Sequence, residues 1–438
     1  MNDSGNETLS GLSRRDFLRG SAAAIATAGL ATSAVAAKAP VKPAAKPAPK
    51  PIANPAVKPP SLVRAAIIGT GSQGTLLLNQ ALKAPGVKFV ATCDIYPPHL
   101  EKSLILADGA EGYEDYRKLL ERKDIDAVII ATPLHMHAPI AIDALNAGKN
   151  VFCEKMMAIT IEDAKQMGRT ARDTKKLLQV GHQRRVNDTY TRGFQAIHAD
   201  NALGKITQVR AQWHRNGSWR RAIPDPKFEQ LLNWRMYKEY SHGLMSELGS
   251  HQMDVVNWFL KGTPISVVAM GGIDYWKDGR TTYDNISVIY EYPDGVKATY
   301  TAITTNEYDQ YTEEFMGDQG TIILSPEKGL LFREAKAEKL IWAPMSEKET
   351  SKGKEAIVLD AQATRSDRTR ATGKTLAAKE MKNDYYVELE QFFDSVRTGN
   401  KPACGPEEAL QACVVSIMAN KAVETGEKMK FTPDMFTY

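Results

Sequence analysis

Two short motifs carry the side chains best suited to acid–base chemistry. The first, Glu154-Lys155, follows the apolar run Val151–Cys153, which predicts a buried strand. A lysine at the end of a parallel strand can hold a substrate hydroxyl and help to move its proton, if burial and neighbouring charge tune its pKa. A surface pair of opposite charges is the alternative. The carboxyl edge of such a sheet is where ligands bind, which favours the functional interpretation.

The second motif is Glu247-Leu248-Gly249-Ser250-His251, which Asp254 follows. A helix through this segment places Glu247, His251 and Asp254 on one face, because their spacings are four and three residues. A histidine between two carboxylates can be held in one tautomer and act as an acid or base near neutral pH. A solvated charged face is the alternative, but the apolar residues after Asp254 indicate that this helix is partly buried.

A glycine-rich segment predicts a dinucleotide site. Gly69-Thr70-Gly71-Ser72-Gln73-Gly74 lies between a β-rich run, 63–68, and an expected helix, 73–83. The glycines allow a tight turn and close approach of the backbone to a pyrophosphate, while the helix N-terminus offers N–H donors. Asp94, at the end of the next strand, can accept both ribose hydroxyls and would repel a 2′-phosphate, so NAD is favoured over NADP. A glycine-rich turn that binds nothing is the alternative.

Alternating strands and helices must position these motifs. From Leu62 to Val180, strand-like runs alternate with helical segments, which predicts a doubly wound parallel sheet with helices on both faces. After about Arg185, longer alternating strands predict a mostly antiparallel sheet, with a hairpin turn at Pro293-Asp294-Gly295. One face of that sheet needs a cover, supplied either by the C-terminal helices or by a second subunit. The chain is therefore expected to be α/β, with an α+β domain after the parallel sheet.

Residues 1–60 are predicted to be an export signal followed by a linker. Arg14-Arg15 precedes an uncharged alanine-rich stretch, and Ala34-Val35-Ala36 has a small-x-small cleavage pattern, so residues 1–37 predict a twin-arginine signal peptide. A transmembrane anchor is the alternative, but alanine-rich segments of this length insert poorly. We expect export to the periplasm or another extracytoplasmic compartment. Residues 38–60, with eight prolines and five lysines, predict an extended linker.

Charge and composition exclude several classes of protein. The formal charge of +4 arises from the five lysines of 38–60, since residues 1–37 are balanced and 61–438 carry about −1. A nearly neutral folded region has no electrostatic reason to bind nucleic acid. Four cysteines in 438 residues are too few for a disulfide scaffold. No stretch after the signal is long and apolar enough to span a bilayer, so we expect no stable membrane insertion.

These motifs together resemble the Gfo/Idh/MocA family of NAD(P)-dependent oxidoreductases, in the same order and at similar spacing from about Leu62 onward. The resemblance implies a Rossmann domain over 61–182 and a substrate and oligomerisation domain over 183–438. It implies that Lys155 and His251 are the catalytic pair and that Glu247 helps to orient the reacting hydroxyl. Residues implied along the cofactor are Thr132, Pro133, His135, His137, Glu154 and Lys155. The sequence departs from the family at Met156, usually proline, and at Glu247, usually aspartate.

Other features indicate the ligand class. His135-Met136-His137 could suggest a metal site, since both rings would face one side of a strand, but no Cys or His partner lies at suitable spacing and we predict no metal. The segment 213–221 ends a strand and is rich in the aromatic and hydrogen-bonding groups that a sugar or polyol needs; a packing or inter-subunit loop is the alternative. Candidate substrate contacts are Arg184, Arg215, Asn216, Trp219 and Asp254.

The leading hypothesis is an exported NAD-dependent oxidoreductase that acts on a hydroxyl of a sugar or polyol and transfers hydride to a tightly bound nicotinamide. An NAD-dependent glycosidase, which would use transient oxidation, elimination, water addition and re-reduction, shares every cofactor motif. A sugar-binding protein without activity is the third possibility, and the intact Lys155 and His251 argue against it. The expected partners are a small carbohydrate and further copies of the chain, which would associate through the C-terminal sheet.

Overall fold

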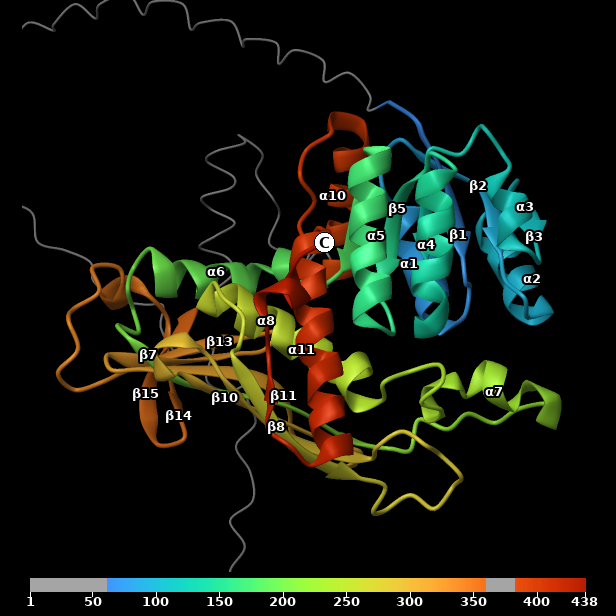
Figure 1. The fold of residues 1–438 in the computed structure, drawn as a ribbon. Helices are drawn as coiled ribbons and strands as arrows, with labels where there is room; N and C mark the ends of the chain where they lie inside the picture. The colour runs from blue at the N-terminus through green and yellow to red at the C-terminus, as the bar shows by residue number, and fades with distance from the viewer. Residues whose placement is uncertain (1–60, 360–382) are drawn as a thin grey trace, which may run out of the picture. The chain divides into compact units, whose positions relative to one another are not determined.

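A computed structural model of the protein describes residues 61–359 and 383–438, so the predicted signal peptide and linker lie outside the described residues. The described residues form two β-sheets with helices packed against both (Figure 1). No helix within these ranges is long and apolar enough to cross a membrane.

The first sheet is parallel and, among the described residues, has the strand order β3-β2-β1-β4-β5-β6. Its strands are β1 (Val63–Ile68), β2 (Val87–Cys93), β3 (Glu111–Tyr113), β4 (Ala127–Ile130), β5 (Asn150–Glu154) and β6 (Leu178–Gly181). The connecting helices are α1 (Ser72–Ala81), α2 (Pro97–Leu106), α3 (Tyr116–Leu120), α4 (His137–Asn146) and α5 (Ile161–Thr174). The strand order reverses between β1 and β4, and ligands bind at the carboxyl ends of the strands beside such a reversal. The prediction of a doubly wound sheet is confirmed.

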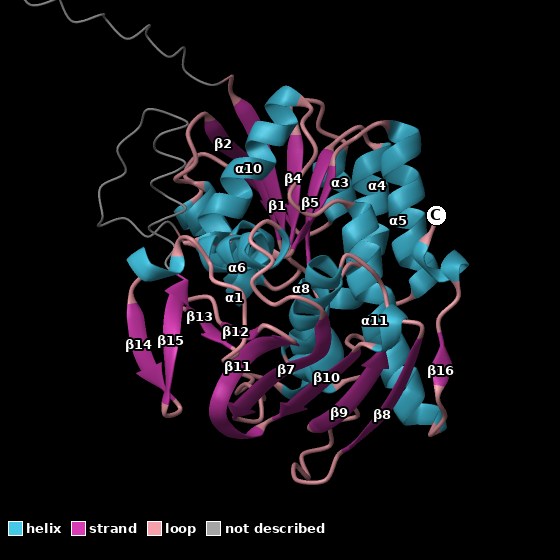
Figure 2. Cartoon of the chain, turned by 90° about the vertical axis from the view of Figure 1, so that its left-hand side faces the viewer, coloured by secondary structure: helices cyan, strands magenta, loops and turns pink. Residues whose placement is uncertain are grey.

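The second sheet is mostly antiparallel, as predicted, with the order β14-β15-β13-β12-β11-β7-β10-β9-β8-β16 in the described part of the chain (Figure 2). Its strands are β7 (Ile206–Asn216), β8 (Ser266–Gly272), β9 (Asn285–Glu291), β10 (Lys297–Ile303), β11 (Thr305–Gly317), β12 (Gly320–Leu324), β13 (Gly329–Arg333), β14 (Lys348–Ser351), β15 (Lys354–Leu359) and β16 (Met429–Lys430). The pair β7–β10 is parallel. The predicted hairpin joins β9 to β10, and Asp294 and Gly295 adopt φ values of 60° and 80° at its turn.

Two long helices cover one face of this sheet. They are α8 (Ser250–Leu260) and α11 (Pro406–Thr425), and the smaller helices of this region are α6 (Asp188–His198) and α7 (Glu229–Leu232). Alternate residues of β9, such as Val288 and Tyr290, are buried on this side, and the Tyr290 hydroxyl donates to the Val415 carbonyl oxygen of α11 at 3.0 Å. The C-terminal helix α11, together with α8, therefore supplies the cover that this face of the sheet was expected to need.

Several apolar side chains on the opposite face of the sheet are exposed to solvent. Met270 is 80% exposed, and Val268 and Ile289 on the same two strands are 38% and 47% exposed. Apolar residues clustered on one sheet face mark an interaction surface more often than isolated ones do.

A helix from the end of the chain completes the core of the first sheet. Helix α10 (Asp384–Thr398) packs against α1 and β1. Phe392 of α10 is fully buried, and its ring lies 5.7 Å from that of Phe152 on β5, centroid to centroid. The predicted division at 182/183 did not foresee this return, because nothing local in 384–398 reveals which sheet will bury its apolar face.

We expect the contact between α10 and the first sheet to contribute strongly to stability. Phe392→Ala removes a buried aromatic ring, which costs about 3–5 kcal/mol when the site cannot collapse. Urea unfolding followed by fluorescence should show a clearly lower midpoint. Gln391→Ala, an exposed neighbour on the same helix, is the control and should leave the midpoint unchanged. Equal midpoints for the two variants would show that α10 is not part of this core.

Candidate active site

A cavity of about 710 Å³ lies between the carboxyl edge of the first sheet and the loops around the second. Its volume is within the usual range for small-molecule and cofactor sites. The predicted residues that line it are Gly69, Gly71, Ser72, Gln73, Asp94, Thr132, Pro133, His135, His137, Glu154, Lys155, Arg215, Trp219, Glu247 and His251. The fold thus brings together the glycine-rich segment, the lysine motif and the histidine motif.

The glycine-rich segment fits a dinucleotide. Gly69 has φ = +87°, and a Cβ there would lie 2.7 Å from the Ala131 carbonyl carbon, so a larger residue is excluded on two grounds. A Cβ on Gly74 would lie 1.9 Å from the Gly69 carbonyl oxygen. Gly71 begins α1 without a capping side chain, which leaves first-turn N–H groups for a phosphate.

Asp94 lies at the end of β2, at the edge of the same cavity. Its Oδ2 accepts from the Thr70 backbone N–H at 2.7 Å, and its Oδ1 accepts from that of Tyr96 at 2.8 Å. Burial raises the pKa of Asp94, but His99 and these two backbone donors outweigh it and lower the pKa below its usual value. The carboxylate is therefore ionised and fixed beside the glycine-rich loop.

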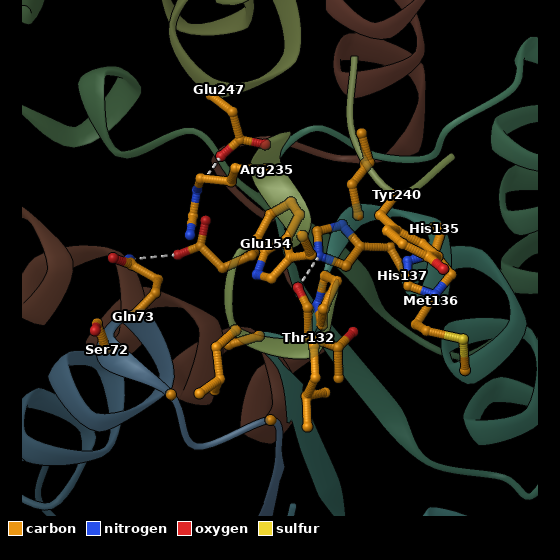
Figure 3. Close-up of a pocket in the computed structure, with 18 of the residues that line it drawn as sticks. Ser72, Gln73, Thr132, His135, Met136, His137, Glu154, Arg235, Tyr240 and Glu247 are labelled. Atoms are coloured by element: carbon orange, nitrogen blue, oxygen red, sulfur yellow. Dashed lines mark hydrogen bonds and ion pairs between the residues drawn. The ribbon is translucent and has the colours of Figure 1, made fainter. Parts of the chain in front are cut away.

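Glu154 is the last residue of β5 and lies on the cavity wall (Figure 3), and Lys155, which follows it, also lines the cavity. The Gln73 amide donates to Glu154 Oε1 at 2.7 Å, which links the lysine motif to the first turn of α1. The Lys155 ammonium donates to the Glu247 carbonyl oxygen at 2.8 Å. Burial lowers the pKa of Lys155, against the charges of Glu247 and Glu154, which raise it. This lysine can therefore exchange a proton more readily than a solvated one.

Glu247 sits in a π-helical turn, Met245–Gly249, and not in the first turn of the expected helix. Such turns are frequent at functional sites. Arg235 pairs with its carboxylate, Nε to Oε2 at 2.7 Å (Figure 3), and the Ser241 hydroxyl donates to its Oε1 at 3.0 Å. Burial alone would raise the pKa of Glu247, but the charges of Arg235 and Lys155 lower it.

His251 is 6% exposed and lies in the first turn of α8. Its Nδ1 has no hydrogen-bond partner among the described residues. Burial lowers the pKa of His251 well below its usual value, and the nearby charges of Lys155 and Arg184 lower it further. The ring is therefore neutral near pH 7, with a nitrogen available to accept a proton.

The two histidines after β4 are not in a strand, so the expectation that both rings face one side is wrong. His135 lies in a 3₁₀ turn, Leu134–Met136, and His137 begins α4. The His137 ring contacts two carbonyl oxygens, of Met156 through Nδ1 at 2.8 Å and of Thr132 through Nε2 at 3.0 Å. The His137 ring therefore links Met156, which follows Lys155, to Thr132, which follows β4. Figure 3 shows the contact with Thr132.

Three predicted substrate residues are not among those that line the cavity. Arg184 forms a buried ion pair with Glu313, and Asn216 is exposed at the end of β7. Asp254 accepts three hydrogen bonds from Arg185, at 2.8 to 3.0 Å. Ion-pair partners thus occupy Arg184 and Asp254, two of the three side chains that were expected to bind substrate.

One buried group of possible metal ligands occurs in the described ranges. It consists of His182, Asp254 and Cys404, whose ligand atoms lie within 4.8 Å of one another. The Arg185 guanidinium already occupies the Asp254 carboxylate and places a positive charge there. Neither predicted histidine of the 135–137 segment belongs to this group.

Several cavity residues were not predicted from the sequence. They are Tyr96, His99, Arg235, Tyr240 and Tyr385, whereas Trp213 and Arg221 lie in the segment 213–221 that was considered for sugar binding. Arg235 and Tyr240 lie in an irregular segment before the π-helical turn, where no periodicity signals their direction. Tyr385 comes from α10, far along the chain.

Comparison with known proteins agrees with this architecture. The family model described as an oxidoreductase family with an NAD-binding Rossmann fold matches residues 63–182, and the GFO/IDH/MocA C-terminal domain matches 192–323. The chain belongs to the Gfo/Idh/MocA oxidoreductase family. A twin-arginine translocation signal matches residues 11–31, which indicates export by that route to the periplasm or another extracytoplasmic compartment, as predicted.

The relatives include members of both enzyme classes considered above, dehydrogenases and glycosyl hydrolases. The chain is 31% identical over 201 residues to an inositol 2-dehydrogenase of Salmonella paratyphi B, covering 45% of this chain and 54% of that one. It is 35% identical over 174 residues to a glycosyl hydrolase family 109 protein of Shewanella baltica, covering 37% and 38%. The chain thus spans less than two thirds of the length of these curated relatives. The WlbA dehydrogenase of Bordetella pertussis, solved with NADH and UDP-GlcNAcA, has the same fold with a TM-score of 0.67 at 19% identity, covering 85% and 98%.

Protonation of His182 should reduce stability in acid. This histidine is 1% exposed, and burial lowers its pKa to about 4, although Asp254 raises it. In the unfolded chain a histidine has a pKa of about 6.5. Below this pH the unfolded state binds a proton that the folded state does not, so the free energy of unfolding decreases as the pH falls. This difference corresponds to about 2 kcal/mol between pH 8 and pH 5.

The measurement is urea unfolding of the wild type and of His182→Gln at both pH values. The variant should lose about 2 kcal/mol less than the wild type on acidification. Equal losses would mean that His182 titrates alike in the folded and unfolded states.

Proposed function

We propose that this protein is an exported NAD-dependent oxidoreductase that acts on a hydroxyl of a sugar or polyol. The observation that carries the proposal is the position of Lys155, whose ammonium is half-buried in the same cavity as the glycine-rich loop and His251. A lysine at the carboxyl edge of the sheet, beside a neutral histidine, is suited to holding and deprotonating a hydroxyl.

Each predicted cofactor residue has a role in this proposal. Gly69, Gly71, Ser72, Gln73 and Gly74 hold the pyrophosphate, and Asp94 holds the adenosine ribose. Thr132, Pro133, His135, His137 and Glu154 lie along the rest of the cofactor. Bound NAD supplies a two-electron acceptor for the carbon that bears the hydroxyl.

The chain's own residues manage the proton. Lys155 binds the substrate hydroxyl and lowers its pKa by charge, and His251, neutral near pH 7, accepts the proton. Glu247, fixed by Arg235, holds Lys155 in place through its main-chain carbonyl and keeps a negative charge nearby. This charge limits how far burial lowers the pKa of the lysine.

A polyol or sugar substrate is supported by the aromatic and amide groups of the cavity and by the similarity to an inositol 2-dehydrogenase. The outer face of the second sheet, with Val268, Met270 and Ile289 exposed, supports a homo-oligomer. Residues 38–60 are proposed to be a linker between the signal and the enzyme.

A redox-neutral glycosidase is the second candidate function. It is favoured by the similarity to a glycosyl hydrolase family 109 protein and by the export signal. Little free NAD is expected outside the cytoplasm, so a retained cofactor must be restored in place. A cycle that returns the electrons to the same sugar achieves this without a second substrate.

Removal of the lysine should abolish turnover. We expect Lys155→Met to lose activity while the protein stays folded and keeps its NAD, and His251→Ala to lose about 10²–10⁴-fold. Steady-state rates, circular dichroism and bound NAD are the measurements. Lys118→Met, on the surface of α3, is the control. A Lys155→Met variant that retains a tenth of the wild-type rate would remove this residue from the mechanism.

The preference for NAD should depend on Asp94. In Asp94→Ala the repulsion of a 2′-phosphate is lost, so the ratio of NADP to NAD affinity should rise. Titration of nucleotide-free protein with both cofactors measures that ratio. An unchanged ratio would mean that another group selects the nucleotide.

The cofactor should remain bound through purification. Mature protein purified without added nucleotide and then denatured should release NAD(H) close to one per chain. The same preparation is incubated with free sugars and with glycosides. Accumulating NADH supports the oxidoreductase, and released aglycone without net NADH supports the glycosidase. Empty protein that exchanges NAD freely would contradict retention.

A further inference from the structure

Two arginines in the cavity have no acidic partner. Arg215 ends β7 and Arg221 follows it in the loop to α7, and both side chains line the cavity. Within the described residues, neither guanidinium donates a hydrogen bond to another residue, and neither forms an ion pair. By contrast, Arg220 pairs with Glu229 and Asp278.

The position of Arg215 leaves its donors available. Its guanidinium stacks on the Trp219 ring at 4.9 Å from the centroid, so one face is covered by the indole. Stacking of this kind leaves the N–H groups at the edge of the guanidinium unpaired. Arg215 is half-buried, and a half-buried charge without a partner is costly.

The unpaired charge lies at the reactive end of the cavity. Burial lowers the pKa of Arg215, and the charge of Arg235 lowers it further, whereas Arg221 is exposed at the mouth of the same cavity. Arg235 in turn acts on Lys155. Geometry agrees with this placement: Trp213, two residues before Arg215 and on the same face of β7, has its ring centroid 5.6 Å from that of His251.

The acids of the cavity do not balance this charge. Glu247 is paired with Arg235, and Glu154 adjoins Lys155 and accepts from Gln73. Asp94 and Glu114 follow β2 and β3 and line the other end of the cavity. Arg215 and Arg221 therefore leave two positive charges without an acidic partner in the cavity that Lys155 also lines.

We infer that the substrate is an anionic carbohydrate, whose carboxylate or ester-linked anion is bound by Arg215 and Arg221 while its hydroxyl meets Lys155. The inference rests on the proposed function for the reaction and goes beyond it in naming the charge of the substrate. Guanidinium groups bind carboxylate and phosphate through paired N–H donors, which fixes the orientation of the sugar as well as its affinity. A neutral sugar would leave the half-buried charge of Arg215 unpaired.

Binding, measured separately from turnover, tests this inference. The probes are D-glucuronate, D-galacturonate and glucose 6-phosphate against D-glucose, titrated calorimetrically into NAD-loaded protein at low salt. At least one acidic sugar should bind about tenfold or more tighter than D-glucose, with the preference weakening as salt rises. The two uronates and the phosphate ester distinguish a carboxylate from an ester-linked anion.

The variants assign the preference to these side chains. In Arg215→Gln/Arg221→Gln the preference for the acidic sugar over D-glucose should disappear while the NAD content stays unchanged. Arg64→Gln, at the opposite end of β1, is the control for loss of a surface charge. Equal affinities for all four sugars in the wild type, or a preference that survives in the double variant, would overturn the inference.

Two further results separate the possible failures. Loss of NAD from the double variant would show that the arginines hold the phosphates of the dinucleotide, which also overturns the inference. An acidic sugar that binds through these arginines, yet yields neither NADH nor a released aglycone, would contradict the proposed reaction and leave the charge recognition intact.

Discussion

The structure depends on one costly arrangement, a lysine ammonium taken partly out of water at the end of β5. The Lys155 ammonium is held by the main-chain carbonyl of Glu247, while the carboxylate of Glu247 is fixed by Arg235. An uncompensated charge here would cost several kcal/mol. The second-sheet domain therefore supplies the partners of a group that the first sheet presents. Neither part can make this site alone.

This division explains which features the sequence predicts. The glycine loop, Asp94 and Glu154-Lys155 sit at strand ends, where local pattern and position are linked by the geometry of a parallel sheet. The sequence therefore predicts the doubly wound fold, and most of the predicted cofactor residues at these strand ends line one cavity. The strand assignment of His135 and His137 fails because a 3₁₀ turn and a helix follow β4 directly, and an apolar strand does not reveal where it ends.

The remaining parts of the site depend on contacts distant in sequence. Arg235 meets Glu247 across an irregular segment, and Arg184 and Asp254 meet Glu313 and Arg185 instead of the cavity. A charged residue near a motif has the same local signature whether it faces a ligand or a buried partner. Only the register of β7 against β10 and β11 decides which side chains near residue 215 point into the cavity.

The return of α10 connects the fold to the route of export. Tyr385 of α10 lines the cavity, and Phe392 completes the core of the first sheet. The dinucleotide site is thus finished only after residues 384–398 have been synthesised and packed, although its glycine loop lies at residues 69–74. Twin-arginine translocation carries proteins that are already folded, so this late step can take place in the cytoplasm, where NAD is abundant. A fold that closes its cofactor site last is consistent with the proposal that this protein acquires its cofactor before export.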